Sequence, residues 1–216
     1  MPKASLITLS DQKSAAAEAF RTLRTNIIFA NIDQPLKTLL VTSAAPLDGK
    51  SLTLANLAVV MAQGGRSTIL VDCDLRRPSL HEIFGVPGQP GLTDMVLNNN
   101  DTPPLVATDV EGLQLLPAGT SNVNPADLLT SPRMEAVIAS LKSRADFVLF
   151  DAPPIVAVSD AALLASNLDG ALLVVNAGHT RREHAQRAKE LLEKIHVRVL
   201  GAVLTNAANE GGLSVY

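Results

Sequence analysis

A short stretch of the sequence combines glycine, lysine and serine in the spacing that nucleotide-binding loops use. Residues 44–51 read Ala-Ala-Pro-Leu-Asp-Gly-Lys-Ser, which fits the P-loop pattern with alanine at the first glycine position. In such a loop, backbone N–H groups and the start of the following helix point toward a phosphate. Lys50 would reach the outer phosphates, and the Ser51 hydroxyl would bind Mg²⁺. The residues predicted to surround the nucleotide phosphates are Asp48, Gly49, Lys50, Ser51 and Leu52.

Three aspartates follow apolar runs at points where strands are expected to end. Asp72 and Asp74 follow the run at 69–71, and Asp151 follows the run at 147–150. In open α/β sheets, ligands bind beyond the carboxyl ends of the strands, and Mg²⁺ prefers oxygen ligands. Aspartate also commonly caps a strand end or the next helix. The nearby P-loop favours the interpretation that these carboxylates serve a bound nucleotide and its metal.

Short apolar runs alternate with helical stretches along the chain. Near-continuous apolar runs, typical of strands covered on both faces, predict strands at 39–41, 68–71, 113–116, 147–150, 171–175 and 199–204. Helices are predicted at 14–30, 50–63, 92–97, 131–143, 159–166 and 181–195. Ser131 before Pro132 and Thr180 before a charged stretch are the predicted helix caps. The predicted fold is an α/β, P-loop NTPase-like, mostly parallel sheet flanked by helices on both faces.

The composition limits the classes of protein that the chain can belong to. Its 216 residues are 47% hydrophobic and 18% charged with a net charge of −3, which predicts one domain over 1–216 with a sizeable core. A chain that is not basic is a poor candidate for nucleic-acid binding. The sequence has neither a leader-like start nor a run of 18 apolar residues, so a cytoplasmic location is expected. Cys73, the single cysteine, cannot form an internal disulfide.

Four stretches together resemble one family. They are the triplet Glu18, Arg21 and Arg24, the P-loop at 44–51, the segment Asp-Cys-Asp-Leu-Arg-Arg-Pro at 72–78, and Asp-Ala-Pro-Pro at 151–154. The last two are similar to the family's Walker A′ and Walker B boxes. Over about residues 5–207, the chain resembles the cytoplasmic domain of the bacterial tyrosine kinases (BY-kinases) that control capsular and exopolysaccharide synthesis. That family belongs to the same P-loop group as the ParA and MinD ATPases.

The resemblance implies a kinase that moves the γ-phosphoryl group of ATP to tyrosine hydroxyls. It implies that Lys50 holds the phosphates, that Ser51 and Asp151 hold Mg²⁺, and that Asp74 assists the metal or its waters. Asp72 would accept the tyrosine proton, which agrees with the need to orient an attacking hydroxyl. Asn206, which follows the last predicted strand, would contact adenine.

The resemblance also implies partners. Glu18, Arg21 and Arg24, within a helical segment at 1–34, would build a ring of identical subunits, whereas the residues alone favour a solvated helix face with a same-face salt bridge. A membrane activator, fused or separate, would place the kinase at the inner face of the plasma membrane. Segment 4–9 is similar to the stretch that comes after the membrane region in fused members. The family's tyrosine cluster is reduced here to Tyr216, the predicted phosphoacceptor, in a flexible tail at 209–216.

Two other functions stay open. One is a ParA- or MinD-like positioning ATPase, although those proteins carry an extra lysine early in the P-loop where this chain has Ala45. The other is a nucleotide-binding regulatory module with weak kinase activity, an alternative that the single Tyr216 keeps open. Arg76 and Arg77 could either steer phosphate or pair with acidic side chains. The cluster of Arg181, Arg182 and Arg187 is predicted to be a solvated helix face.

Overall fold

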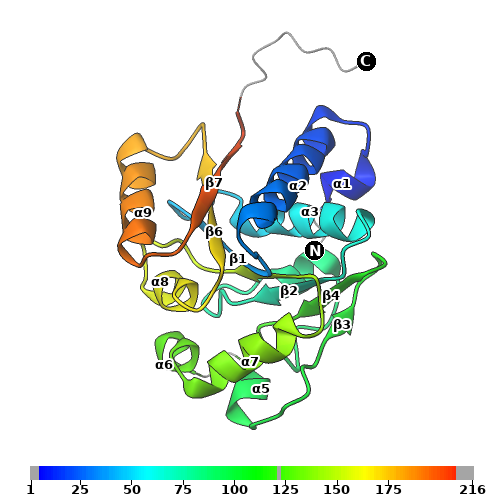
Figure 1. Cartoon of the computed structure of the whole chain (residues 1–216), viewed down its shortest axis with the longest axis vertical. Helices are drawn as coiled ribbons and strands as arrows, with labels where there is room; N and C mark the ends of the chain where they lie inside the picture. The colour runs from blue at the N-terminus through cyan, green and yellow to red at the C-terminus, as the bar shows by residue number, and fades with distance from the viewer. Residues whose placement is uncertain (1–4, 121–122, 208–216) are drawn as a thin grey trace.

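A seven-stranded sheet runs through the middle of the molecule, with helices on both of its faces (Figure 1). The computed structural model describes residues 5–120 and 123–207. The predicted fold class is confirmed.

The sheet is parallel except at one edge. Its order is β3-β4-β2-β5-β1-β6-β7, and only the β3–β4 pair is antiparallel. The strands are β1 (Thr38–Ser43), β2 (Thr68–Asp72), β3 (Val106–Ala107), β4 (Leu113–Leu116), β5 (Phe147–Asp151), β6 (Gly170–Asn176) and β7 (Val199–Thr205). All six predicted strands are confirmed. The two-residue β3 was missed because it is too short to show a periodic pattern.

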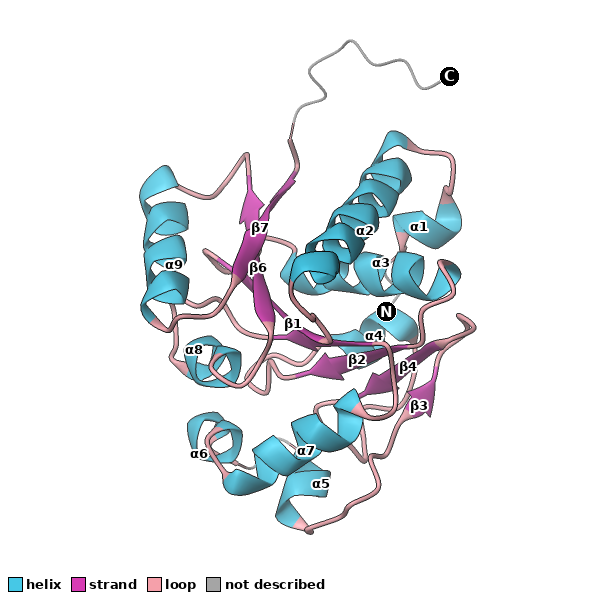
Figure 2. Cartoon of the chain, viewed as in Figure 1, coloured by secondary structure: helices cyan, strands magenta, loops and turns pink. Residues whose placement is uncertain are grey.

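Helices connect the strands and cover the sheet (Figure 2). They are α1 (Ile7–Ser10), α2 (Ala15–Asp33), α3 (Lys50–Gln63), α4 (Leu80–Phe84), α5 (Leu92–Leu97), α6 (Pro125–Leu129), α7 (Pro132–Lys142), α8 (Asp160–Ala165) and α9 (Arg182–Lys194). Every predicted helix is present. The helices that were missed, α1, α4 and α6, have four or five residues each, too few for an amphipathic pattern. Across the described parts of the chain, no helix is both long enough and apolar enough to cross a bilayer.

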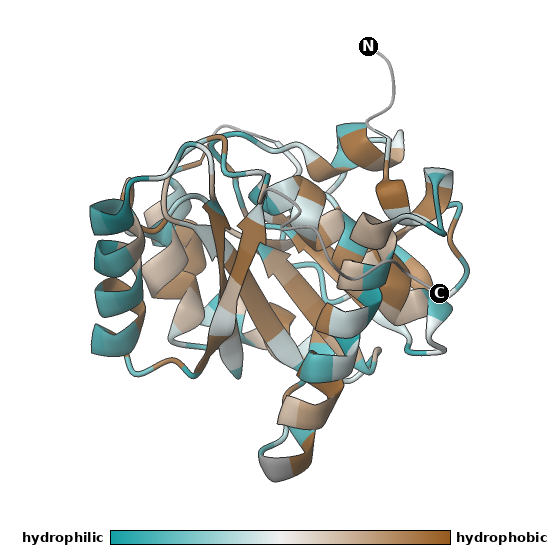
Figure 3. Ribbon diagram, turned by 90° about the horizontal axis from the view of Figure 1, so that it is seen from above, coloured by the Kyte–Doolittle hydropathy of each residue, from teal (hydrophilic) through white to brown (hydrophobic). Residues whose placement is uncertain are grey.

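Each face of the sheet has its own core. Along β1, Leu39 and Val41 pack in the cluster that includes residues of α3, whereas Leu40 packs in the cluster that includes residues of α7 and α8. Successive side chains of a strand point to opposite faces, so an apolar run fills both cores. Figure 3 accordingly shows hydrophobic strands between helices with hydrophilic outer sides. The central strands β1, β2, β5 and β6 are buried along their whole length, whereas β7 is partly exposed, and these buried strands anchor the loops at the carboxyl edge of the sheet.

One of the two predicted caps is confirmed and the other is wrong. The Ser131 hydroxyl accepts the Met134 N–H at 3.2 Å and caps α7. Helix α9 begins after Arg181, and the Thr180 hydroxyl donates instead to the carboxylate of Asp48. A tertiary partner has replaced the local role that the sequence suggested for Thr180.

Candidate active site

The loop at 44–51 leaves β1 and enters α3, as its sequence predicted. Gly49 has φ +80°, a left-handed conformation that glycine adopts without steric cost, and α3 begins at the next residue. Lys50 and Ser51 therefore stand on the first turn of α3, beyond the carboxyl end of β1.

Strand pairing brings the predicted carboxylates together at the same edge. β2 and β5 are parallel neighbours, and Asp72 and Asp151 are register partners at the last positions of these strands. Asp74 follows Asp72 by two residues. Both strands are buried along their length, so these carboxylates stand where the sheet interior meets the P-loop.

The ammonium group of Lys50 lies among oxygen atoms from three segments. Its Nζ atom is 2.8 Å from Asp74 Oδ2, 3.1 Å from Asp151 Oδ1 and 3.1 Å from Ser51 Oγ. The Ser51 hydroxyl in turn donates to Asp151 Oδ2 at 2.5 Å. The Lys50 side chain is 12% exposed, and those of Asp74 and Asp151 are 6% and 0% exposed. Lys50, Ser51, Asp74 and Asp151, all predicted site residues, thus form one contact network.

Asp72 lies beside this network but outside it. Its Oδ2 atom accepts the backbone N–H groups of Ser79 and Leu80, each at 3.0 Å, whereas its buried Oδ1 atom has no hydrogen-bond partner. Burial, followed by the negative charge of Asp151, raises the pKa of Asp72 to about 8. The carboxyl group of Asp72 is therefore mostly protonated at neutral pH in this state of the site.

Burial and charge act in opposite directions on the paired groups. Burial lowers the pKa of Lys50, but the charges of Asp151 and Asp74 outweigh it and hold that pKa above its usual value. For Asp151, burial is the larger effect and raises its pKa despite the opposing charge of Lys50 and the hydrogen bond from Ser51. Asp74 and Asp151 therefore share one buried cation, Lys50. The negative charge of the site is only partly neutralised, which favours the binding of a further cation.

An ion pair joins the segment after β2, which carries Asp74, to the first residue of α8. Arg76 Nε is 2.7 Å from Asp160 Oδ2, and Arg76 Nη2 is 3.1 Å from Asp160 Oδ1. Asp160 is fully buried at the first position of α8, the helix that follows the 151–154 segment. Of the two interpretations of Arg76, pairing with an acidic side chain is confirmed. Asp160 was missed, because an aspartate at a helix start reads as an ordinary first-turn residue.

The donor set fits a magnesium ion. Ser51, Asp74 and Asp151 offer a hydroxyl and carboxylate oxygens, the ligand type that Mg²⁺ prefers. The Lys50 ammonium already lies among these atoms, which shows that they can surround a cation. In the described residues, no three His, Cys, Asp or Glu side chains close around one metal position. A Mg²⁺ ion that is shared with phosphate oxygens and water needs fewer protein ligands.

The remaining residues of the predicted nucleotide site, Asp48, Leu52 and Asn206, lie outside the contact network around Lys50. Asp48 is buried and Leu52 is 41% exposed on the first turn of α3. Asn206 is exposed, has φ +52°, and follows β7 directly. Thr205, the residue before it, donates its hydroxyl to the Asp48 carbonyl at 2.9 Å, so the end of β7 touches the P-loop.

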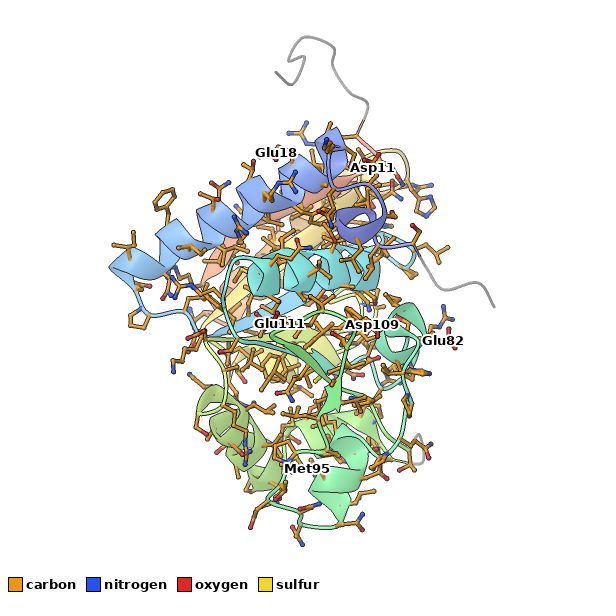
Figure 4. All side chains as sticks on the ribbon, turned by 90° about the vertical axis from the view of Figure 1, so that its right-hand side faces the viewer. Asp11, Glu18, Glu82, Met95, Asp109 and Glu111 are labelled. Carbon is orange, nitrogen blue, oxygen red and sulfur yellow. The ribbon has the colours of Figure 1, made fainter. Side chains whose placement is uncertain are left out.

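The triplet on α2 has mixed surroundings. Arg21 Nε lies 2.7 Å from Glu18 Oε2 on an exposed side of the helix, where Figure 4 labels Glu18. Arg24 Nη1 donates to the Val60 carbonyl near the end of α3 at 3.0 Å. The predicted same-face salt bridge is present. Tyr216 and the predicted tail lie outside the described residues.

Two smaller predictions are confirmed. Cys73 is buried, and burial followed by the charge of Asp72 raises the pKa of its thiol, so it is not a reactive thiolate. Arg181, Arg182 and Arg187 are exposed at the start and on the surface of α9.

Comparison with known proteins shows that most of the chain is similar to P-loop NTPases and tyrosine-protein kinases. Residues 36–209 match the ParA family model, described as NUBPL iron-transfer P-loop NTPase. Tyrosine-protein kinase YwqD of Bacillus subtilis is 41% identical over 200 residues, covering 92% of this chain and 84% of the relative. Tyrosine-protein kinase wzc of Salmonella typhimurium is 31% identical over 202 residues, covering 93% of this chain but 28% of that longer protein.

A solved structure agrees closely with the fold. The kinase domain of the Escherichia coli tyrosine kinase ETK superposes with a TM-score of 0.90 at 28% identity, covering 98% of this chain and 84% of the other. The similarity thus spans every segment that contributes a side chain to the Lys50 network.

Proposed function

The chain belongs to the bacterial tyrosine-protein kinases, a family built on the ParA-type P-loop fold, and we propose that it serves capsular or exopolysaccharide synthesis. It is a protein-tyrosine kinase that uses ATP. The observation that carries the residue roles below is the convergence of Lys50, Ser51, Asp74 and Asp151 beyond the carboxyl ends of β1, β2 and β5.

Lys50 is the residue that meets the phosphates. Its Nζ atom now pairs with Asp74 and Asp151, so it must exchange carboxylate oxygens for phosphate oxygens when a nucleotide enters the P-loop. Both kinds of partner are anionic, so Lys50 keeps its charge throughout. In phosphoryl transfer the protein mainly positions groups and neutralises charge, and a lysine at a P-loop does both.

Ser51, Asp74 and Asp151 are the residues that would hold Mg²⁺. Bound there, the ion would neutralise the charge that develops on the phosphate oxygens during transfer. When Lys50 turns to the phosphates, Asp74 and Asp151 lose their buried partner and would otherwise be left as unpaired buried charges.

Asp72 is the candidate acceptor of the tyrosine proton. Its free Oδ1 atom can receive a hydrogen bond, and its Oδ2 atom is fixed by two backbone N–H groups. A carboxyl group with a pKa of about 8 is already protonated at neutral pH, so it must lose that proton before it can act as a base. Because the charge of Asp151 contributes to this pKa, any cation that neutralises Asp151 makes Asp72 a more competent base.

The resemblance to the family is the basis on which we propose the assembly and location of the chain. We propose a membrane partner; the relative wzc, of which this chain covers 28%, is long enough to carry such a part in the same chain. We propose that such a partner holds the kinase at the inner face of the plasma membrane, and that α2 joins the subunits in a ring through Glu18, Arg21 and Arg24. Tyr216 is the proposed phosphoacceptor, delivered by the last residues of the chain.

Mass spectrometry of the purified chain tests the function. After incubation with Mg²⁺-ATP, we expect phosphate on Tyr216 that is absent from the Lys50→Ala and Tyr216→Phe variants. A tyrosine-rich peptide added to the Tyr216→Phe variant separates two remaining outcomes. Peptide phosphorylation would assign the activity to other substrates, and ATP hydrolysis without phosphotyrosine would favour a positioning ATPase or a regulatory module.

A further inference from the structure

The P-loop contains a buried carboxylate, Asp48, that is not part of the contact network around Lys50. Asp48 is 1% exposed, although the preceding residue, Leu47, is 84% exposed. Asp48 forms no ion pair with any lysine or arginine that the structure describes. A negative charge inside a loop that receives phosphate opposes ligand binding, so its presence calls for a compensating role.

The carboxylate of Asp48 joins the P-loop to a second loop. Its Oδ2 atom accepts the Ala45 N–H at 2.8 Å, across the turn of the P-loop itself. Its Oδ1 atom accepts the Thr180 hydroxyl at 2.5 Å, from the segment between β6 and α9. The same Thr180 oxygen accepts the Asn176 N–H at 3.2 Å, so the Thr180 side chain is fixed from both sides.

A separate contact ties the same residue to the end of β7. The Asp48 carbonyl accepts the Thr205 hydroxyl at 2.9 Å. The P-loop is therefore attached through one residue to the loop after β6 and to the last residue of β7, the two strands that follow β1 on that side of the sheet.

The backbone on either side of Asp48 needs such support. Leu47 has φ +67° and Gly49 has φ +80°, both in the left-handed region. Glycine accepts this conformation freely, but a leucine there is strained and keeps it only when surrounding contacts enforce it. The bonds from Ala45, Thr180 and Thr205 to Asp48 are the contacts next to that strained position.

We propose that Thr180 and Asp48 are a positioning pair, which holds the P-loop in its phosphate-binding shape. Thr180 touches neither phosphate nor metal in this role and acts only through Asp48. The inference rests on nucleotide binding by the P-loop. Without the Thr180 bond, the loop spends part of its time in other shapes, and the apparent nucleotide affinity falls by the fraction of time lost.

Binding of a fluorescent ADP analogue in the presence of Mg²⁺ tests the pair. We expect Thr180→Val to weaken ADP binding about tenfold, which corresponds to a loop in its binding conformation a tenth of the time. Thr180→Ser keeps the hydroxyl, so its ADP affinity should stay close to that of the unaltered chain. With ATP and a tyrosine-rich peptide, the loss should appear in KM for ATP while kcat at saturating ATP is unchanged. Thr108→Val is the matched control, because this half-buried hydroxyl bonds to the Leu113 carbonyl at the far edge of the sheet.

Asp48→Asn gives an independent reading, and it replaces Thr180→Val if that variant does not fold. The amide has one acceptor oxygen where the carboxylate has two, so the Thr180 hydroxyl loses its charged acceptor and can at most accept a weaker bond from the amide N–H. ADP binding should therefore weaken. Tighter binding by Asp48→Asn would show that charge repulsion dominates and would overturn the proposal. Equal ADP affinity for Thr180→Val and Thr180→Ser would also overturn it. Two outcomes would instead contradict nucleotide binding at the P-loop, on which the inference rests. They are no ADP binding by the unaltered chain, and equal ADP binding by Lys50→Ala.

Discussion

The Nζ atom of Lys50 lies 3.1 Å from Oδ1 of Asp151, an atom with no exposure to solvent. The pair joins the first turn of α3 to the end of β5, and Asp74 shares the same ammonium group at 2.8 Å. Without nucleotide, Lys50 is therefore the counter-ion of the acidic edge of the sheet, and its replacement should affect folding as well as catalysis.

Lys50→Met should destabilise the nucleotide-free protein by about 3 kcal/mol, because removing one partner of a buried ion pair leaves the other charge unpaired. Urea unfolding measures the free energy of unfolding. The Lys50→Met/Asp151→Asn double variant removes two of the three charges and leaves Asp74 without its partner, so it should recover only part of the loss. Equal stability of Lys50→Met and the unaltered chain would mean that the pair is open in solution.

Ser51→Ala should raise the Mg²⁺ concentration that half-saturates ADP binding about tenfold, as expected if the lost oxygen–metal contact contributes about 1.4 kcal/mol. Ser51→Thr keeps the hydroxyl and serves as the control. Titration of Mg²⁺ at fixed fluorescent ADP gives the value. An unchanged Mg²⁺ requirement in Ser51→Ala would remove Ser51 from the proposed metal ligands.

Asp72 should make the stability of the protein pH-dependent. Between its usual pKa and its folded value of about 8, Asp72 is protonated in the folded chain and ionised in the unfolded chain. The folded state binds more protons in that window, so the contribution of Asp72 lowers the free energy of unfolding as the pH rises from about 4 to 8.

Asp72→Asn should therefore melt at a higher temperature than the unaltered chain, by a margin that grows from pH 5 to pH 8. Calorimetry without nucleotide or Mg²⁺ follows the melting temperature, and the exposed Asp11→Asn is the control. A margin that shrinks as the pH rises would contradict the assignment.

Arg76→Ala should leave Asp160 as an unpaired buried charge and cost about 3 kcal/mol, toward the low end for a broken buried pair because Arg76 is itself half-exposed. The neighbouring Arg77→Ala, at an exposed side chain, should change stability by no more than about 0.5 kcal/mol. Chemical unfolding compares the two. An equal loss of stability in Arg77→Ala would show that shortening any arginine side chain in the segment at 72–78 destabilises the protein, and would contradict a specific role for the Arg76–Asp160 pair.

The triplet on α2 can be divided into a folding contact and an assembly contact. Arg24→Ala loses a hydrogen bond to the Val60 carbonyl and should cost about 1 kcal/mol. Arg21→Ala breaks an exposed ion pair with Glu18 and an exposed hydrogen bond to the Gln12 carbonyl, together worth less than about 1 kcal/mol. If the triplet builds the ring, Arg21→Ala should lower the mass measured by light scattering without a matching loss of stability. An unchanged mass would leave Glu18 and Arg21 as a surface salt bridge.

Much of the fold could be read from the sequence because its signals are local. The six longer strands are continuous apolar runs, and Gly49-Lys50-Ser51 marks the turn into α3 within a few residues. The carboxyl-edge placement of Asp72, Asp74 and Asp151 also followed, since parallel strands end at the same edge of a sheet. Short elements such as β3 and α6 carry too few residues to show a period.

The particular partners of the site residues were decided by the tertiary structure. Arg76 and Asp160 are 84 positions apart, and Asp48 and Thr180 are 132 positions apart, so no spacing rule connects them. Thr180 has the residue type and position of a helix cap, yet a buried carboxylate from another loop takes its hydroxyl. A buried charge without a partner is costly, so folding selects the donor that reaches it, and only the assembled sheet determines which donor that is.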